Sequence, residues 1–160
     1  MPKVCATDAW RRERLDKDDT MIKKALCIGN VAYTEQTLAN PTNDARDVAG
    51  QLKALGFECI ELADATIANI QEALKRFSEN LHDAEVGLFF FAGHGMQIDG
   101  DNYLTAFNTD FENELDAKYS CLPLNQVIET LERGENPTSI IACTLTAKID
   151  ALSSLAFFCR

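Results

Sequence analysis

Apolar residues in this 160-residue chain form short runs that alternate with stretches of helical periodicity. Four runs have strand length and mostly apolar composition, as in strands buried on both faces: residues 24–30, 57–64, 86–93 and 138–145. The segment 96–107 has Asp99-Gly100 between extended flanks, which predicts a hairpin with a tight turn. A polar loop follows this hairpin. No linker or repeat divides the chain.

Three stretches between these runs predict helices. The first, residues 43–56, has Ala45, Val48, Leu52 and Leu55 at helical spacing, with Asn43 as the expected cap and Gly56 as the stop. The other two are residues 66–83, with the apolar stripe Ile67, Ile70, Leu74, Phe77 and Leu81, and residues 122–134, with Pro123 in the first turn and Gly134 as the stop.

Strands that alternate with amphipathic helices predict an α/β fold, with a mostly parallel sheet covered on both faces. In such sheets, functional groups gather at the carboxyl ends of the strands. Gly29-Asn30, Gly93-His94-Gly95 and the residues after Leu145 all fall at that edge. His94 between two glycines has room to act as a base across a cleft, although a ligand or an ordinary turn would look the same.

Cys143 is the candidate nucleophile because it lies 49 residues after His94, in or just beyond the fourth strand run. Strand ends that are distant in sequence can bring a thiol and an imidazole together, and the imidazole then supports a thiolate. The alternative is that Cys143 is a buried core thiol. The second histidine, His82, is expected at the surface.

The composition of the chain excludes some classes of binding partner. The formal net charge is −10, which argues against nucleic acid and anionic membranes as partners. No apolar run reaches the roughly 20 residues of a membrane span, and no secretory signal opens the chain, so we expect a cytoplasmic location. We read residues 1–22 as a polar leader and residues 23–160 as one domain. The six scattered cysteines are expected to be reduced, and with two histidines they predict no metal site.

Four segments carry a family resemblance: "KKALCIGNVAY", "NDARDVAGQLKALGFE", "ALKRFSENL" and "LFFFAGHGMQIDGDNYL". In this order, over roughly residues 22–140, they resemble the large-subunit (p20) core of caspase-like cysteine peptidases, with metacaspases and paracaspases as the nearest branches. The resemblance implies a three-layer caspase-like fold and proteolysis after Arg or Lys of protein or peptide substrates.

The resemblance also assigns roles to residues. His94 corresponds to the catalytic base of the Ala-Gly-His-Gly motif, and Asp44 to the aspartate that reads the basic substrate side chain. The amide of Gly95 is a candidate donor to the oxyanion. Asp44 would equally suit the first turn of a helix as a carboxylate favoured by the helix dipole. These roles are expectations that depend on the family match.

The chain departs from the family after the fourth strand run. There the family carries Asp-Ala-Cys-Arg, whereas this chain reads "IIACTLTAKID". With three residues lost, Cys143 takes the nucleophile position. Without a gap, Thr146 takes it, and the site then lacks a thiol and is inactive. The spacing does not choose between these registers.

The carboxyl end raises the question of partners. The family continues with two further strands, its small subunit, and "KIDALSSLAFFCR" is too short to supply both. The fold is therefore expected to be incomplete on that side, with an uncovered strand unless the tail, a separate small subunit or another caspase-like chain covers it. No cofactor is predicted. Calcium dependence stays open: Asp99 and Asp101 are expected near the cleft, but an Asp-Gly-Asp turn is usually only a hairpin tip.

Two functions remain from different classes. The first is a cysteine endopeptidase that uses His94 and Cys143. The second is a catalytically inactive caspase-like module that acts through protein contacts, which we slightly favour for this chain. A flavodoxin-like nucleotide-binding protein is a distant third, because no glycine-rich phosphate loop follows the first strand.

Overall fold

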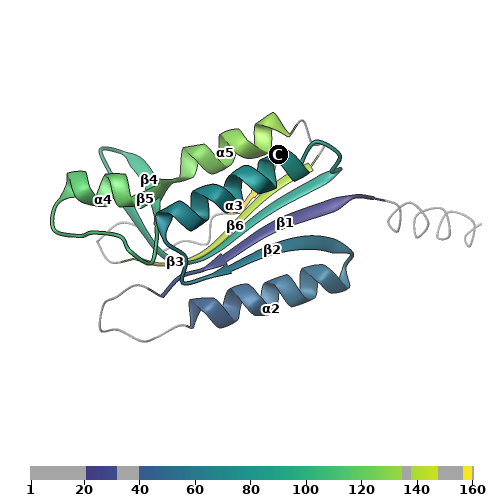
Figure 1. Cartoon of the computed structure of the whole chain (residues 1–160), viewed down its shortest axis with the longest axis horizontal. Helices are drawn as coiled ribbons and strands as arrows, with labels where there is room; N and C mark the ends of the chain where they lie inside the picture. The colour runs from purple at the N-terminus through teal and green to yellow at the C-terminus, as the bar shows by residue number, and fades with distance from the viewer. Residues whose placement is uncertain (1–20, 32–39, 135–137, 148–156, 160) are drawn as a thin grey trace, which may run out of the picture.

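The computed structural model describes residues 21–31, 40–134, 138–147 and 157–159 (Figure 1). Almost all of the predicted polar leader, residues 1–22, lies outside these residues. The strands are β1 (Lys23–Gly29), β2 (Phe57–Ala63), β3 (Val86–Ile98), β4 (Asp101–Thr105), β5 (Cys121–Pro123), β6 (Thr138–Ala147) and β7 (Phe157–Cys159). The helices are α2 (Pro41–Ala54), α3 (Ile67–Asn80), α4 (Glu114–Ser120) and α5 (Leu124–Arg133).

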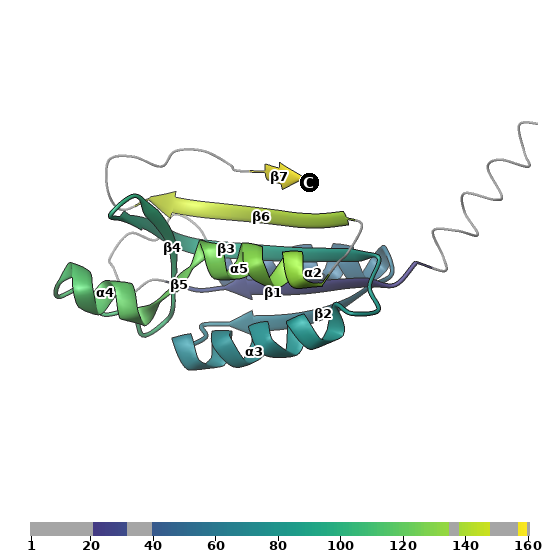
Figure 2. The ribbon, with the colours of Figure 1, turned by 90° about the horizontal axis from the view of Figure 1, so that it is seen from above.

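One mixed sheet of seven strands organises the described residues. The pairs β1–β2, β1–β3 and β3–β6 are parallel, whereas β4, β5 and β7 join in antiparallel pairs. The same segment of β3, residues 86–92, pairs with both β1 and β6, so these two strands lie on opposite sides of it. Figure 2 shows the resulting order β2, β1, β3, β6 and β7 across the sheet.

Helices cover both faces of this sheet, which confirms the predicted α/β architecture. Figure 1 shows α3 and α5 over one face and α2 over the other. Strand side chains alternate between faces. Phe89 and Phe91 accordingly belong to the core under α3 and α5, while Phe90 and Ala92 belong to the core under α2.

The helix ends correct two details of the prediction. Asn40, rather than Asn43, caps α2: its side chain accepts a hydrogen bond from the backbone amide of Asn43 at 3.3 Å. Leu55, expected on the apolar stripe, is 64% exposed because α2 ends at Ala54. Gly56 follows with a positive φ of 86°, the left-handed conformation that often ends a helix.

The predicted hairpin is confirmed. Asp99 and Gly100 have φ values of 53° and 86° and join β3 to β4, with Ile98 paired to Asp101. Two features differ from the sequence prediction. Strand β3 continues through the Gly93-His94-Gly95 segment to Ile98 instead of ending at residue 93, and the supposed polar loop contains the short helix α4.

The carboxyl-terminal tail contributes a strand to the sheet. Strand β7 pairs antiparallel with β6 through Ile140, Ile141 and Ala142 (Figure 2). The outer edge of β6 is therefore partly covered by the chain's own tail, one of the alternatives expected from the sequence. The rest of the tail before β7, residues 148–156, lies outside the described residues.

Candidate active site

His94 lies on β3 where the parallel part of the sheet narrows. The last β1 residue, Gly29, pairs with Ala92, two positions before His94, while β6 continues alongside to Gly95. The hydroxyl of Thr105, a buried residue at the end of β4, donates a hydrogen bond to the backbone carbonyl of His94 at 3.0 Å. His94 itself is half-buried. The expected neighbour relation between the strands of His94 and Cys143 is confirmed.

Strand alternation places His94 on the α2 face of the sheet. Phe90 and Ala92 pack in the core under α2, and His94 follows them at the same two-residue spacing along β3. The neighbouring position, Gly95, faces the other way: a Cβ atom there would lie 3.2 Å from the Leu145 side chain, which packs against the α3–α5 core.

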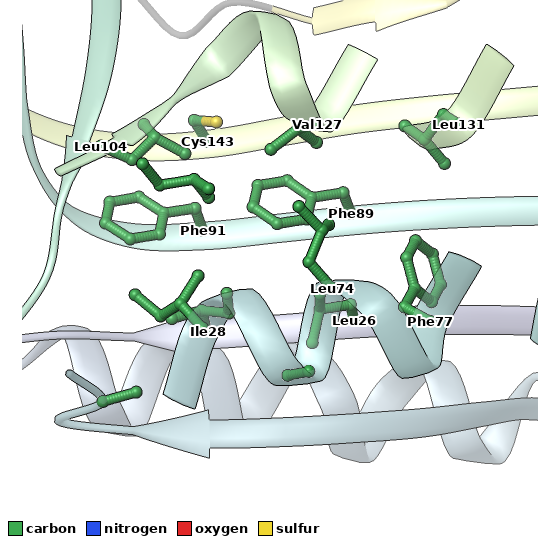
Figure 3. Packing of buried hydrophobic residues seen from close by; sticks show 14 of the residues in the cluster. Leu26, Ile28, Leu74, Phe77, Phe89, Phe91, Leu104, Val127, Leu131 and Cys143 are labelled. Carbon is green, nitrogen blue, oxygen red and sulfur yellow. The ribbon is translucent and has the colours of Figure 1, made fainter. Parts of the chain in front are cut away.

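Cys143 lies on the opposite face of the same sheet. Its register partner on β3 is Phe91, and both belong to the core under α3 and α5. Figure 3 shows Cys143 in this apolar core together with Phe91 and Leu104. The structure therefore does not bring Cys143 to His94. The residue is three register positions from His94 and faces the other core.

Burial also suppresses the reactivity of this thiol. Cys143 is only 7% exposed, and its removal from water raises the pKa of the thiol from 9.0 to about 11. Desolvation has this effect because it disfavours the charged thiolate. A nucleophilic cysteine needs the reverse, an accessible thiol with a lowered pKa. Cys143 has the properties of a structural core thiol.

Thr146 is the register partner of His94. Cys143 could reach the carboxyl-terminal edge of the sheet only if β6 ended before it. Strand β6 instead runs to Ala147, so Cys143 lies inside the strand. Of the two registers left open by the sequence, this pairing corresponds to the one that puts Thr146 at the nucleophile position.

Asp44 lies in the first turn of α2, at the same end of the sheet as His94. Its backbone amide donates to the carbonyl of Asn40 at 3.0 Å. This first turn fits closely over the end of β1: a Cβ atom at Gly29 would lie 2.3 Å from the Pro41 carbonyl oxygen. Gly29 pairs with Ala92 on β3. The fold therefore brings the helix of Asp44 to the edge that carries His94, and it supports the first-turn role for Asp44.

Gly95, the proposed oxyanion donor, lies inside the sheet. It pairs with Leu104 on one side and with Ala147 on the other. An oxyanion donor must direct its amide toward the substrate. Because paired strands flank Gly95 on both sides, the structure places it between strands and not at an open edge.

Asn30, which the sequence places at the functional edge without a role, is a buried anchor of this region. It is 1% exposed, and its side-chain amide accepts from the Ala65 amide at 2.8 Å and donates to the Thr105 carbonyl at 3.1 Å. Its backbone amide donates to Ala92 at 2.9 Å. Asn30 thus ties together β1, β3, β4 and the loop before α3, and its β3 partner Ala92 lies two residues before His94. Its only sequence signal is a polar residue that follows a buried strand.

The thiols and carboxylates do not form a metal centre in the described part of the chain. No group of three or more His, Cys, Asp or Glu side chains there is arranged to hold a metal ion. Asp99, at the hairpin tip, instead forms an ion pair with Lys118 at 3.6 Å. The cysteines described with side chains are free thiols: Cys27, Cys59, Cys121 and Cys143. No helix among the described residues is both long and apolar enough to cross a membrane.

Comparison with known proteins agrees with this architecture. The family model for the caspase domain matches residues 22–151, so this chain belongs to the caspase domain family. The crystal structure of the Drosophila initiator caspase Dronc has a similar fold, with a TM-score of 0.53 and 7% sequence identity. That similarity covers 75% of this chain and 54% of Dronc.

Two curated relatives share the same region. The human mucosa-associated lymphoid tissue lymphoma translocation protein 1 is 26% identical over 127 residues, and its mouse homolog matches equally. The match covers 79% of this chain but 15% of each relative, so this chain corresponds to a small part of their length. The caspase-like assignment made from the sequence is confirmed.

Proposed function

We propose that this chain is a catalytically silent caspase-like module that acts through contacts with other proteins. One observation carries the proposal: Cys143 packs in the apolar core under α3 and α5, whereas His94 continues the opposite face of the sheet. A histidine base must lie within roughly 3–4 Å of the thiol that it activates. Cys143 faces the other core three register positions away, which argues against such a contact, and Thr146 is the residue in register with His94.

A covalent probe tests this proposal. We expect a peptidyl-arginine probe that captures reactive thiols to leave Cys143 unlabelled in the native chain. The Thr146→Cys variant introduces a thiol at the position paired with His94. We expect this new thiol to react with the probe, and His94→Ala to slow that reaction by about 10²-fold or more. Mass spectrometry of tryptic peptides identifies the labelled cysteine.

The matched control combines Cys143→Ala with Thr146→Cys, because it removes the native thiol from β6. Labelling of β6 in this variant must then come from position 146. Rapid labelling of native Cys143 that His94→Ala abolishes would refute the silent module.

The competing candidate is a cysteine endopeptidase that cuts protein substrates after Arg or Lys. Membership of the caspase domain family supports it, as does the placement of His94 and the helix of Asp44 at one edge of the sheet. In that case Asp44 would pair with the basic side chain of the substrate. Turnover of a fluorogenic arginyl peptide that both Cys143→Ser and Asp44→Ala abolish would decide for the peptidase. A cytoplasmic location suits either function.

A further inference from the structure

Helix α4 projects at one end of the molecule (Figures 1 and 2), and an exposed apolar surface lies on and next to it. Its members are Phe111, Leu115 and Tyr119, which are 46%, 60% and 76% exposed. Leu115 and Tyr119 are four residues apart and share one face of α4, and Phe111 precedes the helix. We name these three residues the α4 patch. Large apolar side chains exposed together mark interaction sites.

The opposite side of α4 is anchored in the protein. Ala117 is buried in a small core with Tyr103, Cys121 and Ile98. This packing fixes the helix so that Leu115 and Tyr119 remain outside the core. The α4 patch is therefore a fixed surface of the fold.

The loop before α4 is also fixed, and it forms a hollow beside the patch. The Thr109 hydroxyl donates to the Ser120 carbonyl at 3.0 Å and accepts from the Ala106 amide at 2.8 Å. The Asp110 amide donates to the Ser120 hydroxyl at 2.9 Å. An open hollow of about 550 Å³ is lined by Phe107, Asn108, Thr109, Asp110, Phe111 and Glu112. A surface that is already ordered loses less entropy when it binds a partner.

Carboxylates surround this apolar surface. The exposed residues Asp110 and Glu112 flank Phe111, and the exposed residues Glu114 and Asp116 flank Leu115. The single cation in the segment 107–120, Lys118, already pairs with Asp99. The rim of the α4 patch is therefore negatively charged, and it is complementary to a positively charged partner.

We propose that the α4 patch is the docking surface for a segment of another protein that presents an apolar side chain next to arginine or lysine. An apolar centre with a charged rim is the usual anatomy of a protein interface. A second copy of this chain would bring the same negative rim and a net charge of −10, so the two copies would repel each other. Nucleic acids and anionic membranes are repelled for the same reason. This inference extends the proposed function by giving the chemistry of its partner.

Fluorescence anisotropy with designed peptides tests the docking surface. The probe is a fluorescein-labelled 12-residue peptide of arginine, leucine and tryptophan. One comparison peptide has glutamate in place of arginine, and the other has serine in place of leucine and tryptophan. We expect the probe to bind, its affinity to fall as salt rises, and both comparison peptides to bind at least tenfold more weakly.

Variants of the protein locate the binding. We expect Leu115→Ser/Tyr119→Ser and Glu112→Gln/Glu114→Gln each to weaken binding of the probe about tenfold. The hydrogen bonds described above for the loop before α4 use none of these four side chains, so the fold should persist. Circular dichroism and thermal unfolding verify that each variant is folded.

Matched controls carry equivalent changes elsewhere on the surface. Glu72→Gln/Glu79→Gln makes the same charge change on the exposed side of α3, and Leu55→Ser removes another exposed leucine. Asp44→Asn tests whether the arginines of the probe bind near His94 instead. We expect all three controls to leave the affinity unchanged.

Several results would overturn the proposal. They are equal losses in the control and α4 variants, undiminished binding by the α4 variants, and no binding of the probe. Self-association in sedimentation that Tyr119→Ser abolishes would assign the patch to a second copy and would also overturn it. Binding does not depend on catalysis: a failed docking test leaves the silence of Cys143 intact, and peptidase activity would refute that silence without touching the α4 patch.

Discussion

The two faces of the central sheet differ in size and in chemistry. Among the described residues, the core under α3 and α5 has seventeen buried members, including Phe89, Phe91 and Cys143, whereas the core under α2 has seven. The larger core stabilises the fold through apolar burial. The smaller core consists of small side chains together with Leu52 and Phe90, and its face of the sheet continues along β3 to His94. His94, the candidate catalytic base, therefore lies on the face of the sheet that has the smaller core.

This difference shows how strictly a strand position determines the role of a side chain. Shifting β6 by one residue would move Cys143 to the face of His94, since successive side chains point to opposite faces. The observed register pairs Cys143 with Phe91 and Thr146 with His94. The thiol is thus part of the larger core, and the imidazole has no cysteine in register.

The largest expected effect is on the free energy of unfolding, which we expect to fall more when a side chain is truncated in the larger core than in the smaller one. We expect Phe91→Ala to lower the free energy of unfolding by about 3–5 kcal/mol, because it opens a cavity at a fully buried position. Val48→Ala, at a partly buried position under α2, should cost about 1 kcal/mol or less. Urea unfolding followed by circular dichroism measures both. Equal losses from the two variants would contradict the difference between the faces.

A second prediction concerns the junction below His94. Asn30→Ala removes a buried amide that bonds to Ala65 and Thr105, and it leaves those backbone groups without their partner. We expect a loss of about 2–4 kcal/mol, because buried unsatisfied polar groups are costly. The control is Asn125→Ala on the exposed surface of α5, which should change stability by less than about 0.5 kcal/mol. A loss below about 1 kcal/mol for Asn30→Ala would show that this junction does not hold the strand ends together.

The third prediction is a loss of stability at alkaline pH. Burial raises the pKa of Cys143 to about 11, so the folded protein holds this proton more tightly than the unfolded chain, whose thiol titrates near 9.0. The resulting stability is fully present below pH 9 and is lost as pH rises through 11. We expect Cys143 to contribute about 2 kcal/mol to the fall in unfolding free energy between pH 8 and 11.

The matching experiment compares the native chain with Cys143→Ala by urea unfolding across this pH range. Cys27, whose pKa burial raises to about 12, titrates in both proteins and cancels in the comparison. Identical pH dependence in the two proteins would mean that Cys143 is not desolvated in the folded state.

The sequence predicted most of the fold because its periodic segments have a single favourable solution. The stripe Ile70, Leu74 and Phe77 can only be satisfied by a helix against an apolar layer, and α3 is found there with these residues buried. Asp99-Gly100 likewise demands a tight hairpin. Helix α4 was missed because seven residues with three charges give no clear periodicity.

The site was harder to predict because it depends on register and strand length. Glycines around His94 suggested a turn, but β3 continues through them since β4 and β6 pair with this segment. Whether Cys143 or Thr146 is opposite His94 is a matter of pairing between distant strands, which local composition does not encode. The role of Asn30 was also beyond the sequence, although its position at the edge was predicted, because its partners Ala65 and Thr105 lie 35 and 75 residues away.

Disulfide trapping tests the central claim most directly. His94→Cys can be combined with either the native Cys143 or with Thr146→Cys in a Cys143→Ala background. A disulfide requires a Cα separation of about 4.4–6.8 Å, and directly paired residues on adjacent strands lie within this range. Residues on opposite faces of a sheet cannot be bridged without backbone movement. After mild oxidation and mass spectrometry, we predict a cross-link between positions 94 and 146 and none between 94 and 143. A cross-link from position 94 to Cys143 would contradict the account.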